Sequence, residues 1–188
     1  MLLFYNTFHS VLENSISGKY PLIFLAGPTE RTSESTQWRI DFLKEYYPYD
    51  KTYLFVPEFI TMSNYFKYPE GELSFKNSLR LDSKEEARKR YDKILIMSLE
   101  RFLLRKADKI VFWVDRRIED KRYALTTNIE FGNFYSTGKC VCGSPADADN
   151  ISYLKFVLES EMNQIWYYSM RDMIKALKQE LCFLRKQK

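Results

Sequence analysis

The stretch that decides the fold is IVFWVDRRIEDKRYALTTNIEFGNFYSTGKCVC, residues 110–142. It begins with an apolar run at 110–114 and ends with a second one at 139–142, and such runs are typical of strands buried on both faces. Between them, Phe131, Phe134 and Tyr135 recur at helical spacing and form one apolar helix face. A strand, a helix and another strand in this order predict two parallel strands joined by a crossover helix.

The same alternation continues on both sides of this unit. The predicted strands are residues 22–26, 53–56, 110–114, 139–142 and 164–167. The other predicted helices run from Ser35 or Thr36 to just before Pro48, from about 83 to 106, from Asp149 or Asn150 to Leu158, and over 169–186, where Ser169-x-x-Asp172 opens the last one. Residues 59–81 lack clear periodicity and predict a long excursion. This order predicts an α/β fold, with a doubly wound parallel sheet of about five strands flanked by helices.

The length predicts one domain, because 188 residues suffice for one substantial core and are short for two. Hydrophobic residues make up 45% of the chain and include 14 Tyr and 14 Phe, so disorder is excluded as its main state. We expect a single domain over residues 1–188 with its core at about 20–175. The N-terminal segment 1–19 and the C-terminal helix 169–186 are expected to pack on that core.

The charge pattern argues against a nucleic acid as partner, and the lack of a long apolar run argues against a membrane. The net charge of +4 comes from 29 basic and 25 acidic residues, and the basic runs at 84–93 and 175–188 are mixed with acids at helical spacing. This mixture is typical of solvated helix faces, and no nucleic-acid-binding motif accompanies it. No apolar run approaches the ~20 residues that span a bilayer, and residues 1–5 lack a basic leader. We therefore expect a cytoplasmic protein without a nucleic acid or a membrane as partner.

Cysteine and histidine usage limits the chemistry. Cys140 and Cys142 lie two apart on a predicted strand and should share one face of it, and together with Cys182 they are expected to be free thiols. His9 is the only histidine, which leaves no second imidazole for a zinc cluster and argues against a Ser-His or Cys-His catalytic unit. No metal and no cofactor are expected, so carboxylates should carry the chemistry if the protein is an enzyme.

Glu130 is the carboxylate with the most informative position. It follows the strand at 110–114, so we expect it near the carboxyl end of the sheet, where open α/β folds build their sites. A structural role competes, because Thr127-x-x-Glu130 has the spacing of a capping box at a helix start. The two roles are compatible. In the first helical turn the dipole would stabilise the ionised carboxylate by ~0.3 to 1 kcal/mol.

Other residues are expected at the same edge of the sheet. The turn Gly27-Pro28-Thr29-Glu30-Arg31 offers a hydroxyl and a guanidinium that could hold a phosphate or a ribose, or it is a plain turn with a solvent-facing arginine. Trp38 and Arg39, at the start of the next helix, are interpreted as packing and surface residues. Asp115, Arg116 and Arg117 are interpreted as a charged loop near the mouth of the site.

Several pieces of the chain, in their order and spacing, resemble the nucleoside 2-deoxyribosyltransferase superfamily, and its nucleoside 2-deoxyribosyltransferase-like branch above all. They are IFLAGPT at 23–29, Val56-Pro57-Glu58, Glu100 eight residues before Asp108, and NIEFG at 128–132 followed by Gly138-Lys139. The resemblance covers roughly residues 20 to 175. It implies a flavodoxin-like sheet and glycosyl transfer between nucleobases by a double displacement.

The resemblance also implies roles for individual residues. Glu130 would be the nucleophile that attacks the anomeric carbon, and Glu100 would bind or protonate the departing base. A carboxylate nucleophile forms a glycosyl-enzyme that a second attack opens, as in retaining glycosidases. The residues expected to bind substrate are Gly27, Pro28, Thr29, Arg31, Glu58, Thr127 and Asn128.

The chain departs from the family pattern at three places. Ala124 stands where familiar members carry a base-contacting aspartate, and Phe24 stands near the position of a tyrosine hydroxyl beside the nucleophile. The chain also ends in Arg185-Lys186-Gln187-Lys188, whereas transferases use a C-terminal carboxylate of a neighbouring subunit. These departures keep three functions open: glycosyl transfer or cleavage on a nucleoside or nucleotide, hydrolysis of a nucleotide, and a non-catalytic nucleotide-sensing or partner-binding module. Assembly with further copies of the chain is left open as well.

Overall fold

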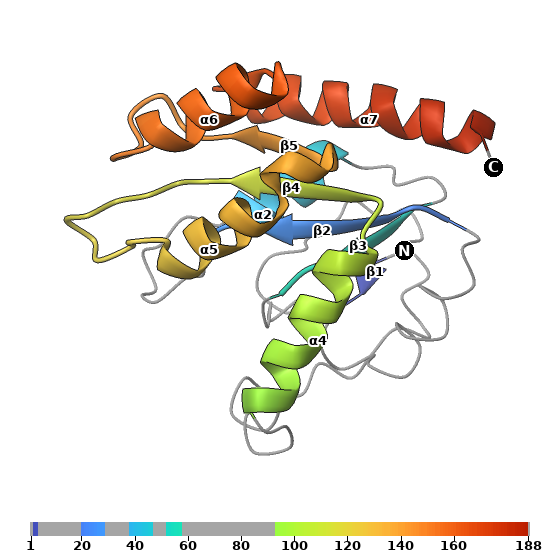
Figure 1. Ribbon diagram of the computed structural model, residues 1–188, viewed down its shortest axis with the longest axis horizontal. Coiled ribbons are helices and arrows are strands. Elements are labelled where there is room, and N and C mark those ends of the chain that lie inside the picture. The colour runs from blue at the N-terminus through green and yellow to red at the C-terminus, as the bar shows by residue number, and fades with distance from the viewer. Residues whose placement is uncertain (1, 4–19, 29–37, 47–51, 58–92, 188) are drawn as a thin grey trace, which may run out of the picture.

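Five predicted strands and one further strand form a single parallel sheet. The computed structural model describes residues 2–3, 20–28, 38–46, 52–57 and 93–187 (Figure 1). The strands are β1 (Leu2–Leu3), β2 (Leu22–Ala26), β3 (Tyr53–Phe55), β4 (Lys109–Trp113), β5 (Cys140–Gly143) and β6 (Trp166–Tyr167). They pair in the order β1-β3-β2-β4-β5-β6, and every pair is parallel. From β2 onward this is the flavodoxin-like order 2-1-3-4-5.

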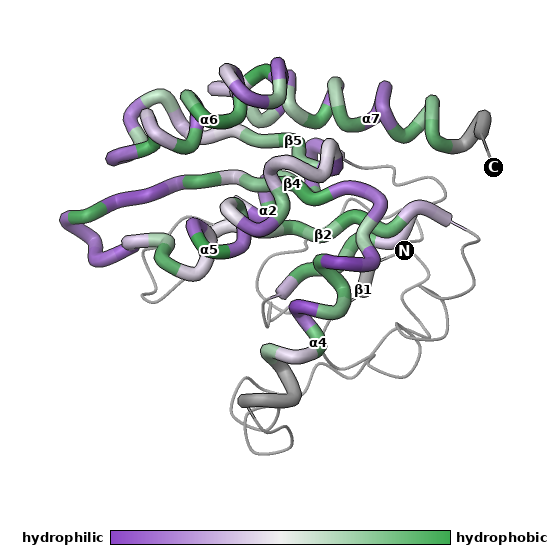
Figure 2. The backbone as a smooth tube through the Cα atoms, viewed as in Figure 1, coloured by the Kyte–Doolittle hydropathy of each residue, from purple (hydrophilic) through white to green (hydrophobic). Residues whose placement is uncertain are grey.

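Helices cover both faces of this sheet, which confirms the doubly wound α/β prediction. They are α2 (Trp38–Tyr46), α4 (Lys93–Lys106), α5 (Leu125–Phe134), which continues into the 3-10 turn η4 (Tyr135–Thr137), α6 (Ser152–Met162) and α7 (Met170–Gln187). One buried cluster joins the sheet to α4, α5 and α6, and the other joins it to α2 and α7. The apolar colouring of the central strands in Figure 2 agrees with their burial on both sides.

Alternation along the strands divides the core between the two faces. Phe24 of β2 packs with the α4 face, whereas its neighbours Ile23 and Leu25 pack with the α7 face. Cys140 and Cys142 share the first face and Val141 lies on the second, as predicted, and the cysteines are free thiols. Burying this apolar surface contributes about 25 cal/mol per Å² to the free energy of folding.

Several predicted helix ends need correction. The predicted cap of α6 at Asp149 or Asn150 is wrong: Ile151 precedes the helix without a side-chain cap, and the helix continues to Met162. In α7, by contrast, the Ser169 hydroxyl accepts a hydrogen bond from the Asp172 amide at 3.3 Å, as expected for an N-cap. The predicted helix residues 83–92 and the excursion at 59–81 lie outside the described residues.

Across the described ranges, the search for a membrane-spanning helix found none of sufficient length and apolar character.

Candidate functional site

The direction of the strand order reverses at β2 and β4, at the carboxyl ends of these two strands. The chain leaves β2 toward β3 on one side, and it returns through α4 to β4 on the other side of β2. In open α/β sheets, ligands bind at this reversal, outside the carboxyl ends of the two strands. Gly27-Pro28 follows β2, and residues 114–116 follow β4, so both segments lie where the strand order reverses.

Close packing at this edge requires Gly27. Its φ is +155°, and a Cβ built there would lie 2.5 Å from the Trp113 carbonyl oxygen and 2.6 Å from the Trp38 ring. A Cβ built on Gly143, at the end of β5, would lie 3.0 Å from the Trp113 ring. The strand ends therefore approach closely around Trp113 and hold the turn after β2 in one place.

Arg39 corrects the interpretation of a surface arginine. Its side chain is only 2% exposed and lies 4.4 Å from the centre of the Trp38 ring. The guanidinium donates to three carbonyl oxygens at the end of β2: to Gly27 at 2.9 Å, to Pro28 at 3.1 Å and to Leu25 at 3.4 Å. Trp38 is buried as expected, and its indole N–H also donates to Pro28 at 3.1 Å. A buried cation thus lies at the edge where the sequence predicts the site.

The capping-box interpretation of Thr127 and Glu130 is wrong. Helix α5 begins at Leu125, with Ala124 at its N-cap in the left-handed conformation (φ 53°) and without a side-chain cap. Thr127 is therefore inside the first turn, and Glu130 lies in the second turn. A helix dipole acts mainly on the first turn, so it contributes less to the Glu130 anion than the sequence suggested.

Glu100 of α4 and Glu130 of α5 lie on two helices that pack on the same face of the sheet. Burial raises the pKa of Glu130 from 4.5 to about 7, and the nearby Arg39 guanidinium acts in the opposite direction. Burial, together with a smaller effect of the negative charge of Glu130, raises the pKa of Glu100 from 4.5 to about 7. The two predicted catalytic residues are therefore close enough for their charges to interact.

Such a pair holds about one proton near neutral pH. Arg39 favours the ionised form of Glu130, while the ionised Glu130 favours the protonated form of Glu100. An ionised carboxylate can attack an electron-poor carbon, and a protonated one can deliver a proton to a leaving group.

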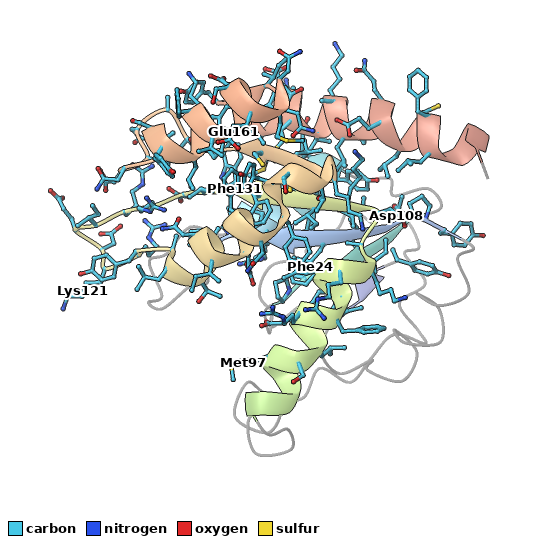
Figure 3. All side chains as sticks on the ribbon, in the orientation of Figure 1. Phe24, Met97, Asp108, Lys121, Phe131 and Glu161 are labelled. Carbon is cyan, nitrogen blue, oxygen red and sulfur yellow. The ribbon has the colours of Figure 1, made fainter. Side chains whose placement is uncertain are left out.

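The charged segment predicted after β4 is held by ion pairs to the buried Asp115. Asp115 is 1% exposed and accepts from Arg117 at 2.9 Å and from Arg122 at 3.1 Å. Arg117 and Arg122 also form an antiparallel bridge, so residues 117–122 make a short hairpin, and Lys121 lies at its outer end (Figure 3). Arg117 additionally bonds Asp147 at 2.8 Å, which ties the hairpin to the loop after β5.

Two of the residues predicted to bind substrate lie at the start of α5. Asn128 accepts a hydrogen bond from the Arg116 guanidinium, which also donates to the Asn150 carbonyl. Burial lowers the pKa of Arg116, and the charge of Asp149 opposes that shift. Thr127 is 2% exposed, so its side chain belongs to the packing of α5 against the sheet.

The remaining predicted residues divide into three groups. Gly27 and Pro28 lie at the end of β2, where Arg39 donates to their carbonyl oxygens. Phe24 lies in the core, 5.1 Å from the Phe55 ring, so it packs as an aromatic side chain should. Thr29, Arg31 and Glu58 lie outside the described residues, and their roles stay predictions.

Sequence reasoning missed Arg39 because its partners lie 11 to 14 residues earlier in the chain. No local spacing distinguishes a buried arginine at a helix start from a solvated one.

In the described part of the chain, no group of three or more His, Cys, Asp or Glu residues could hold a metal ion.

No protein-family model matches this chain, and no curated protein sequence matches it. The fold and the carboxyl pair therefore carry the functional argument.

Proposed function

We propose that the protein cleaves or transfers at the N-glycosidic bond of a nucleoside or nucleotide, as a member of the nucleoside 2-deoxyribosyltransferase-like branch. Glu130 is the nucleophile and Glu100 is the acid. The observation that carries the proposal is the pair of half-buried carboxyl groups of Glu100 on α4 and Glu130 on α5, whose pKa values are both raised to about 7. Values near the working pH suit groups that exchange a proton during each turnover.

The chemistry follows from the two protonation states. The Glu130 carboxylate attacks the anomeric carbon while the bond from that carbon to the base breaks, and Glu100 gives its proton to the departing base. The product is a sugar ester of Glu130. The Glu100 carboxylate then takes a proton from water or from an incoming base as that acceptor opens the ester. Both carboxyl groups return to their starting states, and the sugar keeps its anomeric configuration.

Hydrolysis is the second candidate, and Ala124 favours it. This residue is the N-cap of α5, at the position where the family resemblance would place an aspartate that contacts the base. An alanine methyl group neither donates nor accepts a hydrogen bond, so it cannot hold an acceptor base. Water needs no such recognition, and it should therefore compete strongly with a base for the glycosyl-enzyme.

The test is incubation of the protein with a panel of nucleosides and nucleotides, with and without free adenine, and chromatography of the released bases. Glu130→Gln should abolish release, and Glu100→Gln should lower it by about 10²-fold or more because the leaving base loses its acid. Glu119→Gln is the matched control, since Glu119 is exposed on the hairpin after β4. Full activity of Glu130→Gln would refute the assignment.

The retaining route has a separate test. A 2-fluoro sugar analogue slows the opening of a glycosyl-enzyme, so mass spectrometry of the quenched protein should find the sugar on the Glu130 peptide. Turnover of the analogue with inverted stereochemistry would exclude a covalent intermediate.

A further inference from the structure

Arg116 joins the end of β4 to the starts of two helices. It lies in the segment that follows β4 and is only 7% exposed. Its guanidinium donates through Nη2 to the side-chain oxygen of Asn128 in α5, and through Nη1 to the carbonyl oxygen of Asn150, just before α6. One buried side chain thus restrains both helices.

Neither of these helix starts has a side-chain cap of its own. Ala124 precedes α5 and Ile151 precedes α6, and neither residue caps a helix amide with its side chain. An uncapped start leaves the first amides without an acceptor inside the helix, and such ends fray. The Asn128 amide donates to the Ala124 carbonyl at 3.0 Å and closes the first turn of α5. Arg116 therefore binds the residue at which this helix becomes regular.

The main chain of Arg116 is fixed as well. Its carbonyl oxygen accepts from the Asp149 amide at 3.0 Å, and the Asp149 carboxylate accepts from the Ile118 amide at 2.8 Å. These two bonds hold the segment after β4 against the loop before α6. The guanidinium therefore reaches Asn128 from a main chain that is already held in place.

Asn128 and Glu130 lie on opposite flanks of the buried face of α5. Thr127 and Phe131 are buried and mark that face. Because a helix turns by about 100° per residue, Asn128 lies on one flank of the face and Glu130 on the other. The bond from Arg116 to Asn128 thus acts on Glu130 by fixing the rotation and the position of the helix. A displacement of a reacting group by about 1 Å can lower a rate by about 10²-fold.

We propose that Arg116 is a positioning residue: it holds α5 through Asn128 and thereby places Glu130. The consequence for turnover rests on the proposed function, since it concerns the group that attacks the sugar. The restraint on α5 itself involves no substrate. Asn128 then belongs to the framework of the site and does not bind the substrate, in contrast to what the family resemblance implies.

Hydrogen exchange followed by mass spectrometry tests the restraint without a substrate. Arg116→Met keeps most of the aliphatic side chain and removes the donors, so the amides of residues 125–134 should exchange at least about 10-fold faster. Asn128→Leu should have the same effect, whereas Asn128→Asp keeps an acceptor for Arg116 and should leave exchange slow. Arg105→Met, which changes an exposed arginine of α4, is the matched control and should not alter the exchange of α5.

Turnover distinguishes a positioning role from a general loss of structure. In Arg116→Met, kcat should fall by about 10²-fold, while KM should stay within about 2-fold. Asn128→Leu should show the same division between kcat and KM, and Asn128→Asp should be at least about 10-fold faster than Asn128→Leu. The double variant of Arg116→Met and Asn128→Leu should be no slower than either single variant, because both changes remove one bond.

Two results would overturn the proposal. The first is unchanged exchange of residues 125–134 in a folded Arg116→Met protein, or in Asn128→Leu when Arg116→Met does not fold. The second is a loss of activity in these variants that appears in KM with kcat unchanged, which would place Asn128 in substrate binding. Absence of base release by the unmodified protein would refute the proposed function alone, since the exchange measurement contains no substrate.

Discussion

Glu100→Gln should stabilise the protein, and the gain should depend on pH. The pKa of Glu100 rises from 4.5 to about 7 on folding, and burial is the main cause. The unfolded chain therefore releases this proton at lower pH than the folded protein does. The folded state holds the proton more tightly, so its advantage is present below pH 4.5 and is lost as the pH rises through about 7. Above that range the protein bears the cost of a buried carboxylate.

The size of the effect follows from the shift. A rise from 4.5 to about 7 corresponds to about 3 kcal/mol, at about 1.36 kcal/mol for each pH unit. Glutamine has nearly the shape of the protonated glutamate and no charge at any pH. We expect Glu100→Gln to match the unmodified protein near ~pH 4 and to exceed its free energy of unfolding by about 3 kcal/mol near ~pH 8.

Urea unfolding of both proteins across this pH range measures the difference directly. Glu119→Gln, which changes an exposed glutamate, should show no pH-dependent gain. The gain should also shrink in a Glu130→Gln background, because part of the Glu100 shift comes from the charge of Glu130. If the free energies of unfolding of Glu100→Gln and the unmodified protein differ by less than about 0.5 kcal/mol at every pH, ionised Glu100 does not destabilise the folded protein and the reasoning is refuted.

Three further predictions concern the framework of the site. Gly27→Ala should destabilise the protein by about 2 kcal/mol or more, because the new Cβ would lie 2.5 Å from the Trp113 carbonyl oxygen. Gly132→Ala should stabilise the protein by about 0.5 to 1 kcal/mol, because a Cβ on this helix residue meets nothing within 4 Å. Equal effects of the two substitutions in urea unfolding would contradict this prediction. Asp115→Asn should lower the free energy of unfolding by about 3 kcal/mol, because it leaves two arginines without their buried carboxylate. Asp120→Asn, at the exposed end of the same cluster, should lower it by less than about 1 kcal/mol. Thermal unfolding of the two variants compares these effects. Phe131→Ala should cost about 3 to 5 kcal/mol by removing a buried ring from among three other aromatic rings, and a loss below 1 kcal/mol in the same assay would show that the ring is not part of the core.

Charge interactions at the site bring together residues that are distant in sequence. Glu100 and Glu130 lie on different helices, and Arg39 belongs to a third helix on the other face of the sheet. Each residue type and position is visible in the sequence, but a pKa depends on distance and burial, which arise when the three helices pack. Sequence reasoning could therefore name Glu100 and Glu130, but it could not predict that Arg39 is buried at the end of β2.

The sequence by itself determined the strands and the faces of the sheet. Continuous apolar runs at 22–26 and 110–114 specify buried parallel strands, and the two-residue alternation decides which side chains meet α4 and which meet α7. The same local information places Glu130 on the helix that follows the strand at 110–114, and its position near the carboxyl edge of the sheet stays a prediction. These features depend only on residues that are close together in the chain, so they can be predicted before the fold is known.

Tertiary structure decided the start of α5, the burial of Arg39 and the two-residue strand β1. Helix α5 begins after Ala124, which has a left-handed conformation and comes just after the hairpin held by Asp115. Arg39 is buried because three strand-end carbonyls converge on it, and β1 exists because β3 offers it an unpaired edge. For Arg39 and β1 the partners lie eleven or more residues away in the sequence, and the packing of the strands and helices brings them within hydrogen-bond distance.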